Sequence, residues 1–166
     1  NTQQVKDSKT YEKNFSLSPI SRPVKMENIF YEFGRWELTQ QSEEELLRLV
    51  KLLEDNPNIT IELSAHTDMK GNDEYNQELS QKRAQSCCDF LIQHGIEKER
   101  LTPVGYGKHK PVVADKALHA KYNFIPQEQA LDETFILTLT AEQQEICNQI
   151  NRRTEFKVVK TTYNLY

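Results

Sequence analysis

The stretch NITIELSAHTDMKGNDEYNQELSQKRA, residues 58–84, joins an alternating segment to a polar loop and then to the start of a helix. Its period-two alternation predicts a strand that buries one face. The apolar residues of that face are Ile59, Ile61, Leu63 and Ala65. After the loop, from Met69 to about Tyr75, the helix is expected to run to about Gln93, with Gly95 as its C-cap. The stretch therefore predicts a strand followed by a helix.

Similar patterns extend this unit in both directions. MENIFYEF, residues 26–33, predicts a strand with aromatics on both faces. The segment 38–57 predicts a helix whose N-cap is Thr39 or Ser42. Ser42 would form a capping box with Glu45. LTPVGYG, residues 101–107, predicts a short strand. After a long excursion, a helix around residues 141–149 and a strand in RRTEFKVVK, residues 152–160, complete the order. Such alternation indicates an α/β fold with helices packed on one face of a single sheet.

Composition limits the class of protein. The chain has 166 residues, a formal charge of -4 and a pI of about 5.6. This mildly acidic balance argues against duplex DNA as a partner, since DNA binding depends on Lys and Arg at phosphates. No apolar run approaches the ~20 residues that span a bilayer. Because the chain begins at Asn1, we interpret it as a piece of a longer protein.

The domain boundaries follow from polarity and proline. Residues 1–24 are polar and contain Pro19 and Pro23, which predicts a linker or N-terminal arm. Residues 25–166 are then one domain. The three cysteines lack C-x-x-C spacing, so they predict no zinc site; a disulfide from Cys147 to Cys87 or Cys88 stays a minor alternative.

One acid and one base define the candidate site. Asp68 follows the strand end, where open α/β sheets place ligands. On the next helix, Asn76, Leu79 and Arg83 share one face and are expected to meet the same crevice. An Asp that accepts from an ammonium and an Arg that forks onto a carboxylate suit a zwitterionic ligand. The alternative, slightly preferred on chemistry alone, is that Asp68 and Arg83 pair with each other.

Catalytic and metal chemistry find little support. His66 and Asp68 lie on the same side of an extended chain, but two ligands make no metal site, and His66 is expected to be a hydrogen-bonded structural histidine. A metal-dependent amidase built on these two residues is the enzymatic alternative. No cofactor is predicted. Arg152 and Arg153 are expected to point to opposite faces of their strand, one of them toward the ligand side.

Four segments carry a resemblance to a known family: NIFYEFGRWELT, ELSAHTDMKGNDEYNQELSQKRA, LTPVGYGKHKP and NRRTEFKV. In this order, over about residues 26–111 and 148–159, they resemble the OmpA-like C-terminal domain. That domain is the peptidoglycan-binding module of outer-membrane porins, peptidoglycan-associated lipoproteins and flagellar stator proteins. The resemblance implies a mixed sheet of about four strands in a βαβαβ-αβ arrangement and a non-catalytic module that grips diaminopimelate in the stem peptide.

The resemblance also implies roles for single residues. Asp68 would bind the diaminopimelate amine and Arg83 its carboxylate, which reverses the preference for a direct pair. Thr67 and Asn76 would add hydrogen bonds, and Leu79 would line the pocket. The other side would be closed by Arg152 and by backbone amides near Phe33 and Gly34. Many relatives carry Asp where this chain has Gly34, so only backbone donation is expected there.

The excursion at residues 112–146 is longer than the usual connection in the family. It resembles versions from the bacterial phylum that uses the type IX secretion system, whose multidomain lipoprotein ends in such a wall-binding module. This implies a periplasmic domain that is attached to the outer membrane through the rest of the protein and contacts outer-membrane or secretion-system proteins. The alternative is a protein-interaction module with a vestigial wall pocket, docking through Phe124, Ile125, Phe135 and Leu137.

Overall fold

The protein is built on one four-stranded sheet, seen in a computed structural model that describes residues 22–164. The strands are β1 (Val24–Met26), β2 (Thr60–His66), β3 (Leu101–Gly107) and β4 (Arg153–Lys160), in the order β1-β4-β2-β3. Strands β2 and β3 are parallel, while β4 runs antiparallel to both β1 and β2. The predicted α/β fold with a single mixed sheet is confirmed.

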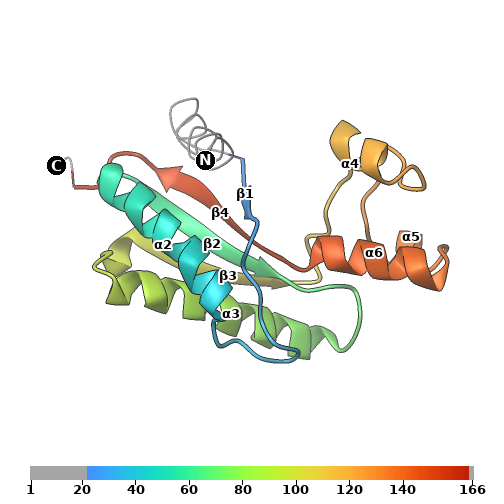
Figure 1. Cartoon of the computed structure of the whole chain (residues 1–166), viewed down its shortest axis with the longest axis horizontal. Coiled ribbons are helices and arrows are strands. Elements are labelled where there is room, and N and C mark those ends of the chain that lie inside the picture. Colours follow the sequence, from blue (N-terminus) through green and yellow to red (C-terminus); the bar gives the residue numbers. More distant parts are fainter. Residues whose placement is uncertain (1–21, 165–166) are drawn as a thin grey trace.

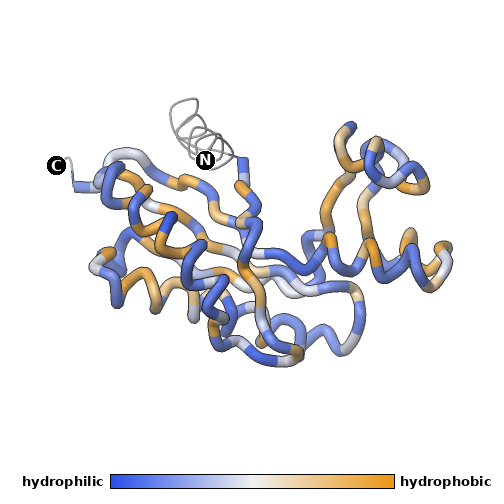
Figure 2. The backbone as a smooth tube through the Cα atoms, viewed as in Figure 1, coloured by the Kyte–Doolittle hydropathy of each residue, from blue (hydrophilic) through white to orange (hydrophobic). Residues whose placement is uncertain are grey.

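Two long helices, α2 (Gln40–Asp55) and α3 (Asp73–Gln93), lie on the same face of this sheet (Figure 1). A short 3₁₀ turn (Lys98–Arg100) leads from α3 into β3. The apolar residues of β2 and β4 and of both helices share one core, and the tube in Figure 2 is orange along these inner surfaces. The largest fully buried side chains of this core are Phe156, Leu46, Leu53, Ile61, Leu63, Leu91 and Val158. The predicted packing of helices on one face is confirmed.

The segment before α2 differs from the prediction. Only Val24–Met26 pairs as a strand, so the predicted strand over residues 26–33 is wrong for most of its length. The hydroxyl of Ser42 donates to the carbonyl of Phe30 at 2.7 Å and accepts from its amide at 2.7 Å. Because this buried serine satisfies both backbone groups of Phe30, the segment turns along the start of α2 instead of extending the sheet.

The same contacts settle the N-cap of α2. The hydroxyl of Thr39 accepts from the amide of Ser42 at 3.2 Å, so Thr39 is the cap. The predicted capping box from Ser42 to Glu45 is therefore wrong.

The excursion forms a small second core. It contains α4 (Lys116–Lys121), α5 (Glu133–Ile136) and an isolated bridge between Val113 and Ala130, and it packs against α6 (Ala141–Asn151) beyond the end of the sheet (Figure 1). Its buried residues are Met69, Ala114, Ile125, Leu131, Ile136 and Cys147. All three cysteines are free; Cys87 and Cys88 lie in the first core and Cys147 in this one, so the alternative of a disulfide is wrong.

The predicted linker lies mostly outside the described residues, and its last residue, Val24, begins β1. Among residues 22–164, no helix combines the length and the apolarity that crossing a bilayer requires.

Strand β3 lies at the edge of the sheet, and α3 closes that edge with side chains. Nε2 of the Gln81 side chain donates to the carbonyl of Pro103 at 3.1 Å, and its Oε1 accepts from the backbone amide of Gly105 at 2.8 Å. The hydroxyl of Ser80 accepts from the amide of Gly107 at 2.9 Å. These contacts replace those of a neighbouring strand, which protects the edge from pairing with another chain.

Such close contact requires glycine at position 105. A Cβ there would lie 2.2 Å from the backbone nitrogen of Gln81. We therefore predict that Gly105→Ala lowers the free energy of unfolding by about 3 kcal/mol, the upper end of overpacking costs. Thr102→Ala, an exposed change on the same strand, should cost less than ~1 kcal/mol. Equal urea midpoints for Gly105→Ala and the parent chain would contradict the packing described.

Candidate functional site

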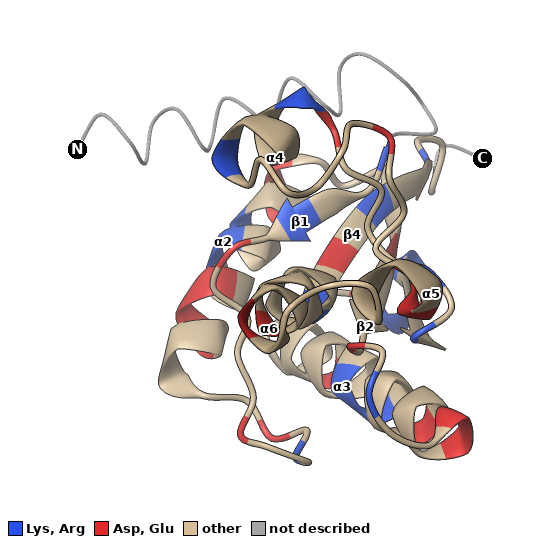
Figure 3. Ribbon diagram, turned by 90° about the vertical axis from the view of Figure 1, so that its right-hand side faces the viewer, with Lys and Arg blue, Asp and Glu red and all other residues tan. Residues whose placement is uncertain are grey.

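The predicted site residues gather at one end of the molecule, where β2 ends and where α3 and β4 begin (Figures 1 and 3). Thr67 and Asp68 follow β2 directly, and Arg152 is the residue between α6 and β4. Asn76, Leu79 and Arg83 come from α3, and Phe33 and Gly34 from the loop before α2. Figure 3 shows basic and acidic segments mixed at this end of the molecule.

Asp68 is held in a fixed orientation. Its Oδ1 accepts from the amide of Lys70 at 2.9 Å, a local turn typical of aspartate. Its Oδ2 accepts from Nη1 of Arg152. The side chain keeps 15% of its exposure, so the carboxylate is oriented by the protein and still reaches the surface.

Arg152 joins two carboxylates. Besides Asp68, it contacts Glu145: Nη2 of Arg152 lies 2.7 Å from Oε1 of Glu145. The other carboxylate oxygen of Glu145 lies 3.2 Å from Nζ of Lys70. Burial lowers the pKa of Arg152, but the hydrogen bonds to Glu145 and Asp68 outweigh it and raise the pKa. The hydrogen bonds from Arg152 and Lys70 lower the pKa of Glu145. The result is a chain of alternating charges that ends at Asp68.

Arg83 does not pair with Asp68. Its Nε donates to the carbonyl of Arg35 at 2.8 Å and its Nη2 to that of Glu32 at 3.4 Å. The guanidinium lies 4.6 Å from the centre of the Tyr31 ring. Burial lowers the pKa of Arg83; the charge of Arg152 also lowers it, and the charge of Asp68 raises it. The alternative of a direct Asp68–Arg83 ion pair is therefore wrong, because each side chain is bonded to other groups.

Three predicted residues lie beneath the surface and support the loop. Nδ2 of Asn76 donates to the carbonyl of Lys70 at 2.7 Å, and the hydroxyl of Thr67 donates to the carbonyl of Asp68 at 3.0 Å. Both side chains are buried, as is that of Leu79. The backbone of the loop is thus fixed by residues on both of its sides.

The turn at Phe33 and Gly34 is the most exposed part of the site. The Phe33 side chain is fully exposed, and Gly34 has a φ of +67°. The turn closes with a hydrogen bond from the amide of Arg35 to the carbonyl of Glu32 at 3.0 Å. Within residues 22–164, the amides of Phe33 and Gly34 donate to no acceptor.

The two residues that the metal hypothesis joined have separate surroundings. His66 is buried, and its Nε2 lies 3.2 Å from the hydroxyl of Ser64 and 3.3 Å from a carboxylate oxygen of Glu155. Its ring stacks on that of Tyr106 at 5.3 Å. In the described part of the chain no three His, Cys, Asp or Glu side chains are grouped to hold a metal ion. The structure confirms a hydrogen-bonded structural His66.

Arg153 anchors the same region. Its Nε lies 3.0 Å from a carboxylate oxygen of Glu155, and its guanidinium also donates to the carbonyls of Asn151 and Lys110. Burial raises the pKa of Glu155, but the hydrogen bond from His66 and the charge of Arg153 lower it to about 2. The expectation that Arg152 and Arg153 point to opposite faces of one strand is wrong, because Arg152 is the C-cap of α6 and only Arg153 belongs to β4. The placement of Arg152 on the ligand side stays a prediction.

Glu145 and Lys70 were missed by sequence reasoning. Glu145 faces Arg152 seven residues along the chain, a spacing of about two helical turns. That spacing is the only sequence signal for the contact, and it is weak because Arg152 lies just past the helix end.

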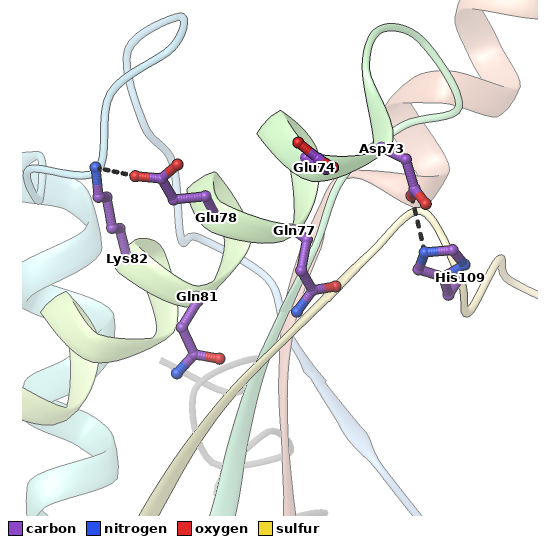
Figure 4. A pocket seen from close by; sticks show the side chains of 7 residues that line it. All are labelled: Asp73, Glu74, Gln77, Glu78, Gln81, Lys82 and His109. Atoms are coloured by element: carbon purple, nitrogen blue, oxygen red, sulfur yellow. Dashed lines mark ion pairs between the residues drawn. The ribbon is translucent and has the colours of Figure 1, made fainter.

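An open groove of about 640 Å³ lies elsewhere, on the outer side of α3 (Figure 4). It is lined by Asp73, Glu74, Gln77, Glu78, Gln81, Lys82 and His109. Two pairs of side chains lie within the groove, Asp73 with His109 at 2.8 Å and Glu78 with Lys82 at 2.9 Å. Gln77 and Gln81 bond to the backbone of β3. The groove shares no residue with the site around Asp68.

Comparison with known proteins gives a family. The model of the OmpA family matches residues 30–123, more than half of the chain. The chain is 34% identical over 104 residues to outer membrane porin F of Pseudomonas fluorescens, covering 62% of this chain and 32% of that protein. It is 33% identical over 86 residues to the peptidoglycan-associated lipoprotein of Agrobacterium fabrum, covering 52% and 49% respectively.

One further relative has an unrelated name. Over 101 residues the chain is 37% identical to photosystem I P700 chlorophyll a apoprotein A2 of Gloeobacter violaceus, which covers 59% of this chain and 12% of that protein. The chain thus spans less than half the length of each of these three curated relatives.

Solved structures share the fold. A putative MotB-like protein from Desulfovibrio vulgaris superposes with a TM-score of 0.59 at 20% identity, covering 96% of this chain and 93% of that one. The peptidoglycan-associated lipoprotein from Burkholderia pseudomallei gives a TM-score of 0.53 at 22% identity, covering 87% and 96%.

Buried His66 makes stability depend on pH. Burial lowers the pKa of His66, so below about pH 6.5, the ordinary value, the unfolded chain binds this proton more readily than the folded one. Stability is then complete above this pH and falls as the pH drops from 7 toward 5. Glu155, with a pKa of about 2, stays charged over this range.

We predict that His66→Gln flattens the dependence of the unfolding free energy on pH between 7 and 5, measured by urea denaturation. His109→Gln is the control, because it leaves the buried His66 in place, so stability should still fall between pH 7 and 5. Identical slopes for His66→Gln and the parent would contradict the burial of an uncharged imidazole.

Proposed function

Because the chain belongs to the OmpA family, we propose that its site binds the diaminopimelate residue of the peptidoglycan stem peptide and anchors a larger protein assembly to the cell wall. The observation that carries the proposal is that Asp68 and Arg83, which flank one end of the fold, are each oriented by other groups and not by each other. An acid and a base held apart match a ligand end that carries an ammonium and a carboxylate on one carbon.

The general class of activity is that of the family. Domains of the OmpA and peptidoglycan-associated lipoprotein type are non-enzymatic modules that bind peptidoglycan in the cell envelope. The finer proposal concerns which part of peptidoglycan this chain recognises and what it anchors.

The ammonium of the ligand would bind Asp68. A carboxylate has about four acceptor positions, and the contacts with Lys70 and Arg152 leave room for further donors. The carboxylate of the ligand would bind Arg83, whose bonds to the two loop carbonyls use two of its five N–H donors. The amides of Phe33 and Gly34, which have no acceptor in the described residues, would add backbone donors from the opposite side.

The remaining predicted residues have supporting roles in this proposal. Thr67 and Asn76 would fix the loop that carries Asp68, since their side chains bond to its backbone. Leu79 would form the apolar floor, and Arg152 would close the other side of the pocket together with the amides near Phe33 and Gly34.

The cellular setting is also part of the proposal. We expect the domain in the periplasm, attached to the outer membrane through the rest of the protein and contacting outer-membrane or secretion-system proteins. Relatives named for the outer membrane and for association with peptidoglycan support this setting. Assignment to the lipoprotein of the type IX secretion system rests on the resemblance of the excursion alone.

Most of the docking surface that the protein-interaction alternative requires is buried or partly buried in the second core. Ile125 is fully buried in the second core, and Phe124 and Phe135 pack against it. Only Leu137, at 69% exposure, stays available for docking. The amidase alternative has no support either, because His66 is buried and paired with Glu155.

We predict that Asp68→Ala and Arg83→Ala each abolish sedimentation of the domain with purified peptidoglycan. Loss of one partner of a desolvated charge contact costs ~2–5 kcal/mol, which is at least a tenfold loss of affinity. Circular dichroism should show an unchanged fold, because Asp68 and Arg83 contribute no side chain to the main apolar core.

Asp73→Ala and Lys82→Ala are matched controls, since they remove one acid and one base from the exposed side of α3. Both should sediment as the parent does. If Asp68→Ala and Arg83→Ala also sedimented normally, the assignment of the site would be wrong.

A further inference from the structure

The loop that carries Asp68 is attached at three successive residues to α6 and its C-cap, the helix against which the excursion packs. Asp68 bonds to Arg152 at the end of α6. The next residue, Met69, is buried in the second core, and its amide donates to the side chain of Asn148 at 3.4 Å. Lys70 then lies 3.2 Å from Glu145. Among residues 22–164, no other hydrogen bond or ion pair joins residues 68–70 to α6 or to the excursion.

Glu145 occupies the centre of these contacts. One of its oxygens faces Arg152 at 2.7 Å and the other faces Lys70 at 3.2 Å. Glu145 therefore binds Nη2 of the Arg152 guanidinium while Asp68 binds Nη1. It also contacts Lys70, whose backbone amide donates to Oδ1 of Asp68. A guanidinium that bridges two carboxylates in this way has little freedom to turn.

We propose that Glu145 is a positioning residue for the ligand site, and that the excursion serves as the support that fixes the Asp68 loop. The inference rests on the proposed function, because it concerns how Asp68 is prepared for the ammonium of diaminopimelate. Arg152 and that ammonium compete for the same carboxylate. Glu145 gives Arg152 a second carboxylate. Arg152 therefore stays paired when Asp68 turns part of its hydrogen-bonding capacity to the ammonium of the ligand, and less interaction energy is lost.

Removal of Glu145 has two consequences that act in the same direction. Arg152 is left with Asp68 as its only carboxylate and neutralises it more completely. The local charge also becomes more positive, which disfavours the approach of an ammonium. Both effects weaken binding of the amine end, while the contacts of Arg83 with the carboxylate end stay as they are.

The test is a calorimetric titration with a diaminopimelate-containing stem peptide. We expect Glu145→Gln to weaken binding about two- to fivefold, the range for a partly exposed ion pair. Glu142→Gln, an exposed change in the first turn of the same helix, should bind as the parent does.

A second readout separates positioning from general stability. In the parent, the side-chain N–H signals of Arg152 should stay protected from solvent exchange when saturating peptide is added, because Glu145 retains the guanidinium. In Glu145→Gln they should lose protection on binding. Met69→Ala, which leaves a gap where the loop enters the second core, should also weaken binding even though it touches no ligand.

The possible outcomes are distinct. Parent affinity and retained Arg152 protection in Glu145→Gln, together with lost binding in Asp68→Ala, would overturn this inference and leave the proposed function standing. Parent affinity in Asp68→Ala would instead overturn the proposed function.

Discussion

The guanidinium of Arg152 lies between two carboxylates that come from distant parts of the chain. Asp68 follows the second strand, and Glu145 belongs to the last helix. Their common contact joins the end of the central sheet to the excursion, and it fixes the residue on which ligand recognition depends. Without this bridge the loop after β2 would keep the burial of Met69, the hydrogen bonds of Asn76 and Thr67 and its own turn, but Asp68 would lose its ion pair. The site therefore depends on a contact between residues that are 84 positions apart.

A second constraint is that Asp68 and Arg83 stay separate. Opposite charges in one crevice tend to form an ion pair, which would make both side chains unavailable to a ligand. Here the loop before α2 supplies carbonyl partners and an aromatic ring to Arg83, while Arg152 occupies Asp68. The loop in turn depends on Ser42, which takes the backbone groups of Phe30 and directs the chain toward α3. Orientation by the protein before binding reduces the ordering cost of the ligand complex.

Local patterns predicted most of the fold correctly. Alternation in β2 and helical spacing in α3 are properties of neighbouring residues, and both elements lie where the sequence places them. The strand expected over residues 26–33 failed because a buried hydroxyl from α2 competes with the sheet for the backbone, a contact that local reasoning does not see. The excursion had no clear pattern because its core is assembled from single residues spread between Met69 and Cys147.

The sequence predicted which residues form the site better than it predicted which side chains contact each other. Strand-end and helix-face rules brought Asp68, Asn76 and Arg83 together without knowledge of the family. The partner of Asp68 was not predictable, since Arg152 and Glu145 approach it only through the packing of the excursion. Residues beneath the loop, such as Thr67, were expected near the ligand, but their side chains bond to the backbone.

The most direct test of the central claim is to titrate the parent chain with two stem peptides that differ only in the third residue, diaminopimelate or Lys. Lys keeps the ammonium but lacks the distal carboxylate, so the comparison isolates the contact with Arg83. We expect the diaminopimelate peptide to bind at least tenfold more tightly, a difference of about 1.4 kcal/mol. Equal affinities would contradict a site that reads both charges of a zwitterion.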